Sequence, residues 1–149
     1  MLHERTEEMW WIHALVMFVG MIVIQVFAMP YMMAERPDHV YFSITQGWMG
    51  AAMGAAMVAL GGLLHPMPLW AWLLCIIVGV VSVLGYRLQW LISDREYIRE
   101  MIPHHSMALV TSRPRVRESQ DPVIVRLAEQ IITVQEREIA EMKHYLQRT

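Results

Sequence analysis

Two adjacent histidines lie between two methionines in the polar part of the sequence, in the stretch Met101-Ile102-Pro103-His104-His105-Ser106-Met107. Imidazole nitrogen and thioether sulfur together favour reduced copper or silver, whereas zinc and iron sites recruit thiolates or carboxylates. Pro103 lacks a backbone N–H, so we expect a bend or a loosened turn beside His104. The residue types and their spacing indicate a candidate site for a soft metal ion, Cu(I) or Ag(I).

A helix is expected to carry this stretch, and a second helix is expected to face it. Ser93-Asp94 can cap the first helix, and Asp121-Pro122 can open the second. On the first helix, one face is predicted to point toward the second, formed by Ile98, Ile102, His105 and Leu109. The facing apolar stripe of the second helix includes Met142 and is interrupted by Gln135 and Glu138. Polar side chains on a buried face need partners, so Gln135 and Glu138 are candidates for further ligands or for hydrogen-bond partners of the ligands. The thioether of Met142 is a candidate for a further ligand.

The ends of these helices determine which residues face each other. The sequence Arg113-Pro114-Arg115 predicts that the first helix ends by Ser112, with a turn centred near Arg117. At about 1.5 Å per residue, that register places Met142 opposite Ile92 and away from the histidines. An asymmetric loop, two separate clusters or a neighbouring protomer would each account for this gap. The other charged residues of the second helix are expected to be solvated: Glu136, Arg137, Glu141, Lys143 and Arg148.

The chain before this region is predicted to cross a membrane three times. Apolar runs at about 9–33, 40–64 and 69–92 each approach or exceed the roughly 20 residues that a spanning helix needs. Residues 34–39 form a short charged turn between the first two runs. From Leu91 onward, nine acidic and nine basic residues alternate as on a solvated helical surface. The tryptophans lie near the ends of the runs, as an aromatic belt predicts: Trp10, Trp11, Trp48, Trp70, Trp72 and Trp90.

The second apolar run contains small residues at helical spacing, including Gly50 and Gly54. Within lipid, small residues allow the close backbone approach that holds helices together, so we expect this span to pack at the centre. Methionines repeat every four residues along it at Met49, Met53 and Met57. They form either a thioether ladder for a soft cation or ordinary packing. Three further histidines lie near predicted membrane ends, where an amphipathic ring is common: His13, His39 and His65.

The segment from Asp94 to Leu146 resembles the family called domain of unknown function 305. The resemblance rests on two motifs, Met101-Ile102-Pro103-His104-His105 and Gln135-Glu136-Arg137-Glu138-Ile139-Ala140-Glu141-Met142. It implies an antiparallel, ferritin-like helical hairpin, and binding of copper or silver through histidine and methionine as in some relatives. The family commonly has methionine at the position of Thr111, so Met107 would have to replace that ligand or the site is weakened. The implied division is a three-helix transmembrane region at 1–92 and a hairpin domain at 93–149.

The fold class predicted is therefore all-α, with three transmembrane helices followed by a hairpin that oligomerisation completes. The function predicted is an integral membrane protein that binds Cu(I) or Ag(I), in metal binding or tolerance, through His104, His105, Met101, Met107, Met142, Glu138 and Gln135. A structural membrane oligomer without metal is the alternative. A di-iron carboxylate enzyme is a remote alternative, because Glu141 and His144 form only one Glu-x-x-His motif. No nucleophile with a base and an orienting group is recognisable, so the chain is not expected to be an enzyme.

Composition and charge narrow the partners to the lipid bilayer, a metal ion and further copies of the chain. The net charge of −2 and the lack of a basic stripe exclude nucleic acid. The single cysteine, Cys75, excludes an intrachain disulfide. We expect a multi-pass protein of the inner cell membrane. The positive-inside rule favours the cytoplasm over the periplasm for the hairpin. Arg5 is the one arginine near the membrane on the N-terminal side, whereas the hairpin side has Arg36, Arg87, Arg95 and Arg99.

Overall fold

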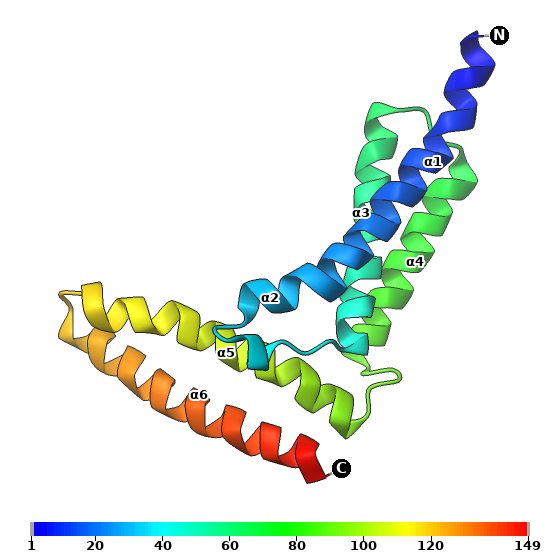
Figure 1. Ribbon diagram of the computed structural model, residues 1–149. Coiled ribbons are helices and arrows are strands. Elements are labelled where there is room, and N and C mark those ends of the chain that lie inside the picture. The colour runs from blue at the N-terminus through cyan, green and yellow to red at the C-terminus, as the bar shows by residue number, and fades with distance from the viewer. Residues whose placement is uncertain (1, 149) are drawn as a thin grey trace. The chain divides into compact units, whose positions relative to one another are not determined.

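The computed structural model describes residues 2–148, with side chains from residue 10 onward. The described chain is helical and contains no strand, which confirms the all-α prediction. Its elements are α1 (Leu2–Val23), the π-helix η1 (Ile24–Ala28), α2 (Met29–Met33), the 3₁₀ helix η2 (Pro37–His39), α3 (Ile44–Leu64), α4 (Leu69–Arg87), α5 (Asp94–Glu118) and α6 (Pro122–Arg148), all traced in Figure 1. They form two compact units. The first comprises Met1–Phe27 and Ile44–Leu91, and the second comprises Ala28–Ser43 and Ile92–Thr149.

Three segments are long and apolar enough to cross a membrane, as predicted: Trp10–Met33, Ile44–Leu64 and Leu69–Arg87. Helix α4, the third of these segments, ends at Arg87, so the prediction that the third run continues to about residue 92 was wrong. Its end is closed by two backbone bonds, from the Gln89 N–H to the Tyr86 carbonyl and from the Trp90 N–H to the Gly85 carbonyl. This pattern is a Schellman motif, in which Gln89 adopts the left-handed conformation with φ of 55°.

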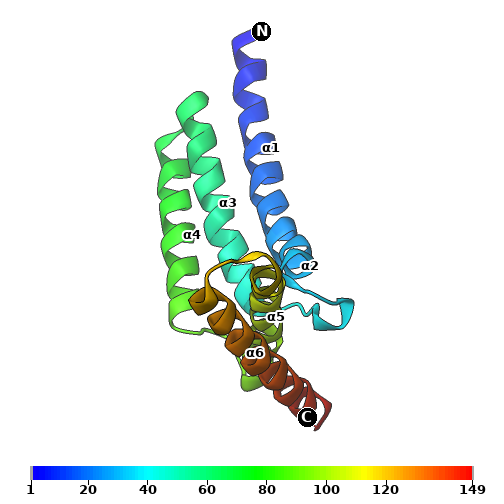
Figure 2. The same ribbon diagram turned by 90° about the vertical axis from the view of Figure 1, so that its left-hand side faces the viewer.

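Helix α3 lies between α1 and α4 in the first unit (Figure 2), which agrees with the prediction from its small residues. Gly50 and Gly54 allow α1 to approach: a Cβ atom on Gly50 would lie 2.9 Å from the Cα of Ile22, and one on Gly54 would lie 3.0 Å from the carbonyl oxygen of Phe18. On the α4 side, Gly85 receives the indole ring of Trp48. Two methionines of the four-residue repeat, Met53 and Met57, are exposed on the surface of this unit.

Paired tryptophans lie at both ends of the first unit. The ring centroids of Trp10 and Trp70 are 5.6 Å apart, where the first candidate membrane span and α4 begin. Those of Trp48 and Trp90 are 6.4 Å apart, and the Trp48 Nε1–H donates to the Trp90 carbonyl oxygen at 3.0 Å. An apolar ring with one polar N–H suits the boundary between lipid and water, so these pairs are consistent with the expected aromatic belts.

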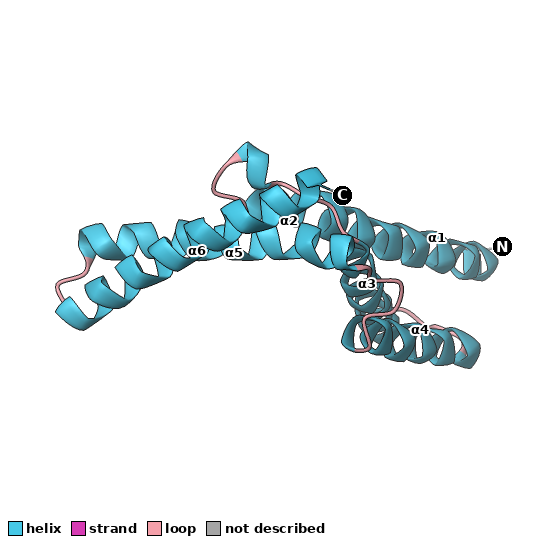
Figure 3. Cartoon of the chain, turned by 90° about the horizontal axis from the view of Figure 1, so that it is seen from below, coloured by secondary structure: helices cyan, strands magenta, loops and turns pink. Residues whose placement is uncertain are grey.

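The second unit is built on the antiparallel pair α5 and α6, seen from below in Figure 3. Both predicted caps are present: the Ser93 Oγ accepts from the Glu96 N–H, and the Asp121 Oδ1 accepts from the Val123 N–H. The prediction that α5 ends by Ser112 was wrong, because the helix continues through Pro114 to Glu118. Each internal proline removes one backbone bond, but the longer helix gains contacts along α6. The buried centre of the pair consists of Ile102, Leu109 and Ile139.

Residues 28–43, here called the inter-span segment, belong to the same compact unit as the hairpin. Its helices α2 and η2 both contact α5. The sequence-based division at 92/93 had left this segment with the transmembrane region and treated its charged part as a simple turn. The structure instead makes it a third layer of the second unit, and Tyr41 packs against the hairpin core.

Candidate metal centre

His105 faces α6, as its position on the apolar stripe of α5 predicts. Its Nδ1 lies 3.1 Å from Oε2 of Glu138, which supplies the partner expected for that interrupting carboxylate. The two atoms are within ion-pair distance, but their alignment does not form a hydrogen bond. The Nδ1 atom is buried and has no hydrogen-bond partner. In the tautomer with the proton on Nε2, the Nδ1 lone pair beside this carboxylate is one that a metal ion could bind.

Two thioethers lie on the same helix faces as this pair. Met101 precedes His105 by one turn of α5, and Met142 follows Glu138 by one turn of α6. Since residues four apart lie above one another on a helix, the antiparallel pairing of His105 with Glu138 brings Met101 level with Met142. Met142 packs against the hairpin core beside Ile102. The predicted position of Met142 opposite Ile92 was therefore wrong, because the loop is at Ser119–Asp121 and shifts the register.

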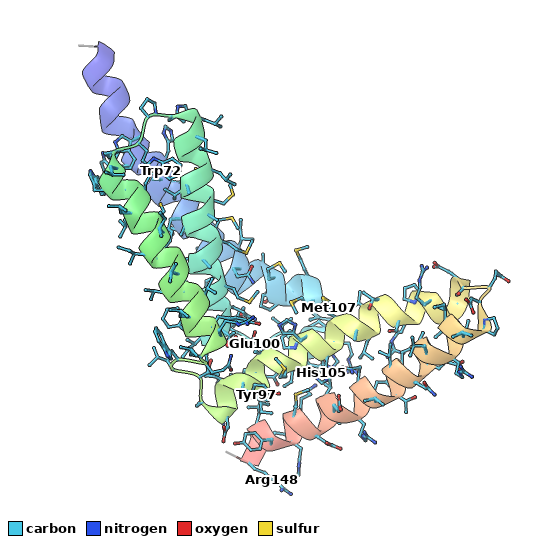
Figure 4. The ribbon with its side chains drawn as sticks, turned by 180° about the vertical axis from the view of Figure 1, so that it is seen from behind. Trp72, Tyr97, Glu100, His105, Met107 and Arg148 are labelled. Atoms are coloured by element: carbon cyan, nitrogen blue, oxygen red, sulfur yellow. The ribbon has the colours of Figure 1, made fainter. Side chains whose placement is uncertain are left out.

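The other predicted site residues are less closely grouped. His104 is 40% exposed, and its Nε2 lies 3.5 Å from Oε1 of the buried Glu100. Met107 is 43% exposed and projects from α5 on the opposite side to His105, as Figure 4 shows. Gln135 is half-buried on α6, one turn before Glu138. Adjacent helical residues point about 100° apart, so His104 and His105 cannot both face α6.

In the part of the chain that the structure describes, no three His, Cys, Asp or Glu side chains gather into a group that could hold a metal ion. Such groups suit zinc or iron. The residues near His105 differ in kind, since the helical register places two thioethers, from Met101 and Met142, one turn from its imidazole and the Glu138 carboxylate. This donor set fits a soft monovalent cation.

The inter-span segment covers α5 on the neighbouring face through a buried serine. Ser106 is fully buried, and its Oγ accepts from the Glu35 N–H at 2.7 Å. The same oxygen lies 2.9 Å from Nδ1 of His39, which is itself only 6% exposed. Because the hydroxyl already accepts from Glu35, its own hydrogen is free to be donated to the neutral imidazole.

Ion pairs hold the inter-span segment to both helices of the hairpin. Arg113 on α5 bonds to Glu35, and its Nη2 also donates to Oε1 of Glu136 on α6 at 2.6 Å. Lys143 on α6 bonds to Asp38. This bond from Lys143 holds the pKa of the Asp38 carboxyl below its usual range. The side chain of Glu136 is 52% exposed, as predicted, although it pairs with Arg113. The prediction that Lys143 is solvated was wrong, because its side chain is only 25% exposed and pairs with Asp38 of the inter-span segment.

A cleft of about 280 Å³ lies beside these ion pairs. It is lined by Glu35, Arg36, His39, Arg113, Glu136 and Lys143, together with the apolar side chains of Leu109, Ile139 and Ala140. This cluster was not predicted from the sequence, since Glu35, Asp38 and Arg113 lie in stretches that are expected to form turns or to face solvent. The one sequence feature that could have indicated this cluster is the charged, proline-containing stretch at residues 34–39, between two spans. Nothing in that stretch identifies its partners, which lie more than 65 residues away.

Acidification is expected to weaken the attachment of the inter-span segment through His39. Burial is the main cause that lowers the pKa of His39. The positive charges of Lys143 and Arg36 also lower this pKa, and the negative charges of Asp38 and Glu35 raise it by less than the total lowering. The unfolded chain therefore binds the proton first, from about pH 6.5 downward. Stability should be complete above that pH and should decline as the pH falls toward the lower folded pKa.

Chemical unfolding of the detergent-solubilised protein at about pH 7.5 and about pH 5.5 measures this effect. The variant His39→Gln should lose much of the dependence, because its amide does not titrate. Asp38 does not interfere, since its pKa is lowered and its titration lies at more acidic pH. An unchanged pH dependence in His39→Gln would assign the effect to other groups.

Comparison with known families supplies the classification of the hairpin. Residues 89–148 match the family described as Domain of unknown function (DUF305). This segment is a DUF305 domain. The family predicted from the two sequence motifs is thereby confirmed, and the match leaves the inter-span segment outside the DUF305 domain even though the two pack together.

A curated relative matches part of the chain. It is "Uncharacterized protein L153" of Acanthamoeba polyphaga mimivirus, 43% identical over 67 residues. The match covers 45% of this chain and 44% of that protein, so the chain spans less than half the length of this relative. No solved structure matches the chain.

Proposed function

We propose that this chain is an integral membrane protein that binds Cu(I) or Ag(I) through its DUF305 domain and acts in metal binding or tolerance. The proposed ligands are His105, Met101 and Met142. Glu138 serves as a further ligand or as a partner of the His105 ring. The spans belong to the inner membrane, with the DUF305 domain on the cytoplasmic side.

The observation that carries this proposal is the buried Nδ1 of His105, which lacks a hydrogen-bond partner on the face shared with Met101. A buried polar atom without a hydrogen bond costs about 1–3 kcal/mol, so an interaction in addition to the 3.1 Å contact with Glu138 would stabilise it. A monovalent cation would provide that interaction while the Glu138 carboxylate balances its charge. The same thioethers and imidazole would bind hard cations poorly, which gives selectivity.

A structural membrane oligomer is the second candidate, and a specific surface favours it. An apolar stripe on α6 remains exposed in the second unit, formed by Val123, Ile124, Leu127 and Val134. A two-helix hairpin with such a stripe can bury it against a second copy. In this case the contact between His105 and Glu138 stabilises the hairpin without any metal.

Elemental analysis of the detergent-purified protein after growth in copper separates the two candidates. The double variant His105→Ala/Met142→Leu should lose about one equivalent of copper per chain relative to the wild type. The control His144→Ala removes a histidine from the exposed surface of α6 and should leave the copper content unchanged. Equal copper in the wild type and the double variant, or none in either, would reject metal binding by the DUF305 domain. An unchanged oligomer in both proteins would then support the structural candidate.

A further inference from the structure

The first unit contains a small pocket where α1 faces the end of α3 and the loop that leads to α4. Two imidazoles and two thioethers line it, from His13, Met17, His65 and Met67. Its volume is about 50 Å³, well below the several hundred Å³ of pockets for organic ligands. A space of this size suits an ion with a few water molecules.

Local structure brings the four side chains to one place. His13 and Met17 are one turn apart on α1 and therefore share a face. His65 and Met67 come from the loop after α3, where Pro66 and Pro68 restrict the backbone. The His65 N–H bonds to the Gly61 carbonyl oxygen, which fixes the start of that loop against the helix end.

Two adjacent glycines of α3 lie next to the sulfur atoms, and one of them, Gly62, makes room for its neighbour. A Cβ on Gly61 would lie 3.6 Å from Sδ of Met17, and one on Gly62 would lie 3.3 Å from Sδ of Met67. A Cβ on Gly62 would also approach the terminal methyl carbon of Met67 to 2.9 Å. The missing side chain at Gly62 thus leaves room for the Met67 thioether, whereas the Met17 sulfur lies at ordinary van der Waals distance from the Gly61 position.

The charge environment of the pocket selects the kind of ligand. Among the side chains that the structure describes, from residue 10 onward, the two histidines are the only ionisable ones that line the pocket. These residues therefore offer a divalent cation no carboxylate to balance its charge. The C-terminal end of α3 lies at the pocket and carries a partial negative charge, which favours a cation. Imidazole and thioether donors with no carboxylate match a monovalent soft metal ion.

We propose that His13, Met17, His65 and Met67 form a second soft-metal site, which binds Cu(I) or Ag(I) at this end of the membrane unit. The site shares no residue with the DUF305 domain and does not depend on metal binding there. His13 and His65 are exposed on the unit, so an ion can reach the pocket from outside the protein.

Silver titration of the full-length protein in detergent tests this site, with Ag(I) as a probe that is not oxidised during the measurement. The parent protein carries His105→Ala/Met142→Leu, so that the DUF305 ligands do not contribute. Adding Met17→Leu/Met67→Leu should weaken the remaining Ag(I) binding by about tenfold to 100-fold or more. Leucine conserves the methionine volume, so the packing of the pocket should be retained.

The matched control is Met53→Leu/Met57→Leu in the same parent, because these two methionines are exposed away from the pocket. It should bind Ag(I) like the parent. In NMR spectra of the wild type, the methyl resonances of Met17 and Met67 should shift when silver is added. This shift would identify the two methionines as ligands without any substitution. Absence of Ag(I) binding in the parent, equal binding after Met17→Leu/Met67→Leu, or equal loss in the control would each overturn the second site and leave the DUF305 proposal untouched.

Discussion

Replacing Gly50 with alanine is expected to destabilise the membrane unit by about 1–3 kcal/mol, because the added methyl group overpacks the contact between α3 and α1. The new Cβ would lie 2.9 Å from the Cα of Ile22 and 3.1 Å from the Cβ of Gln25. The first of these is a backbone atom, which cannot move aside by changing a rotamer. In lipid, close packing is a principal force between helices, so separating these two should affect the whole unit.

Gly47 provides the matched control on the same helix, since a Cβ at that position would meet nothing within 4 Å. Gly47→Ala should be neutral or should stabilise α3 by about 0.5–1 kcal/mol, because alanine loses less backbone entropy in a helix. Unfolding by SDS titration in mixed micelles measures both variants. Equal stability of Gly50→Ala and Gly47→Ala would show that α1 and α3 do not approach each other this closely in the membrane.

The parts of the fold that the sequence predicts are those determined by solvent and by local geometry. Long apolar runs indicate spanning helices because lipid offers no partners to the backbone. The caps at Ser93 and Asp121 depend only on residues within one turn, and both are present. Likewise, the stripe containing Ile102 and His105 follows from helical periodicity, so the side of α5 that faces α6 was predicted correctly.

Helix ends and register were harder to predict because they depend on a balance between local and distant terms. Pro114 imposes a local cost that the sequence makes obvious. The interactions that compensate for this cost join residues that are distant in the sequence. Arg113 and Glu136, for example, are 23 residues apart, and no motif marks them as partners. Extending α5 to Glu118 moves the loop by a few residues, and this shift brings Met142 to the hairpin core.

The inter-span segment could not be predicted, because a charged stretch between two spans is normally solvated. Its contacts involve a hydroxyl and ion pairs with residues that are far away in the sequence, such as Ser106 with Glu35 and Lys143 with Asp38. Each partner taken alone is typical of a solvated helix surface. For the candidate metal centre the same reasoning holds: Glu138 was recognised as needing a partner, but only the register identifies His105 as that partner.

Replacing Ser106 with alanine is expected to destabilise the second unit by about 2–5 kcal/mol, because one hydroxyl satisfies two buried groups. Its Oγ accepts from the Glu35 N–H and is bonded to Nδ1 of His39. Without it, both groups remain buried and unpaired unless the inter-span segment leaves α5. Departure restores their bonds to water, so we expect amide hydrogen exchange across residues 34–43 to accelerate by about tenfold or more.

Thr111→Val is the control, since it also removes one hydroxyl from α5. That hydroxyl is exposed and bonds only to the carbonyl oxygens of Met107 and Ala108, which belong to the same helix. Losing it leaves no buried group unpaired, so exchange in the inter-span segment should remain as in the wild type. If both variants accelerated exchange equally, α5 itself would be loosened. If neither did, the ion pairs of Arg113 and Lys143 would be sufficient to hold the segment without the serine.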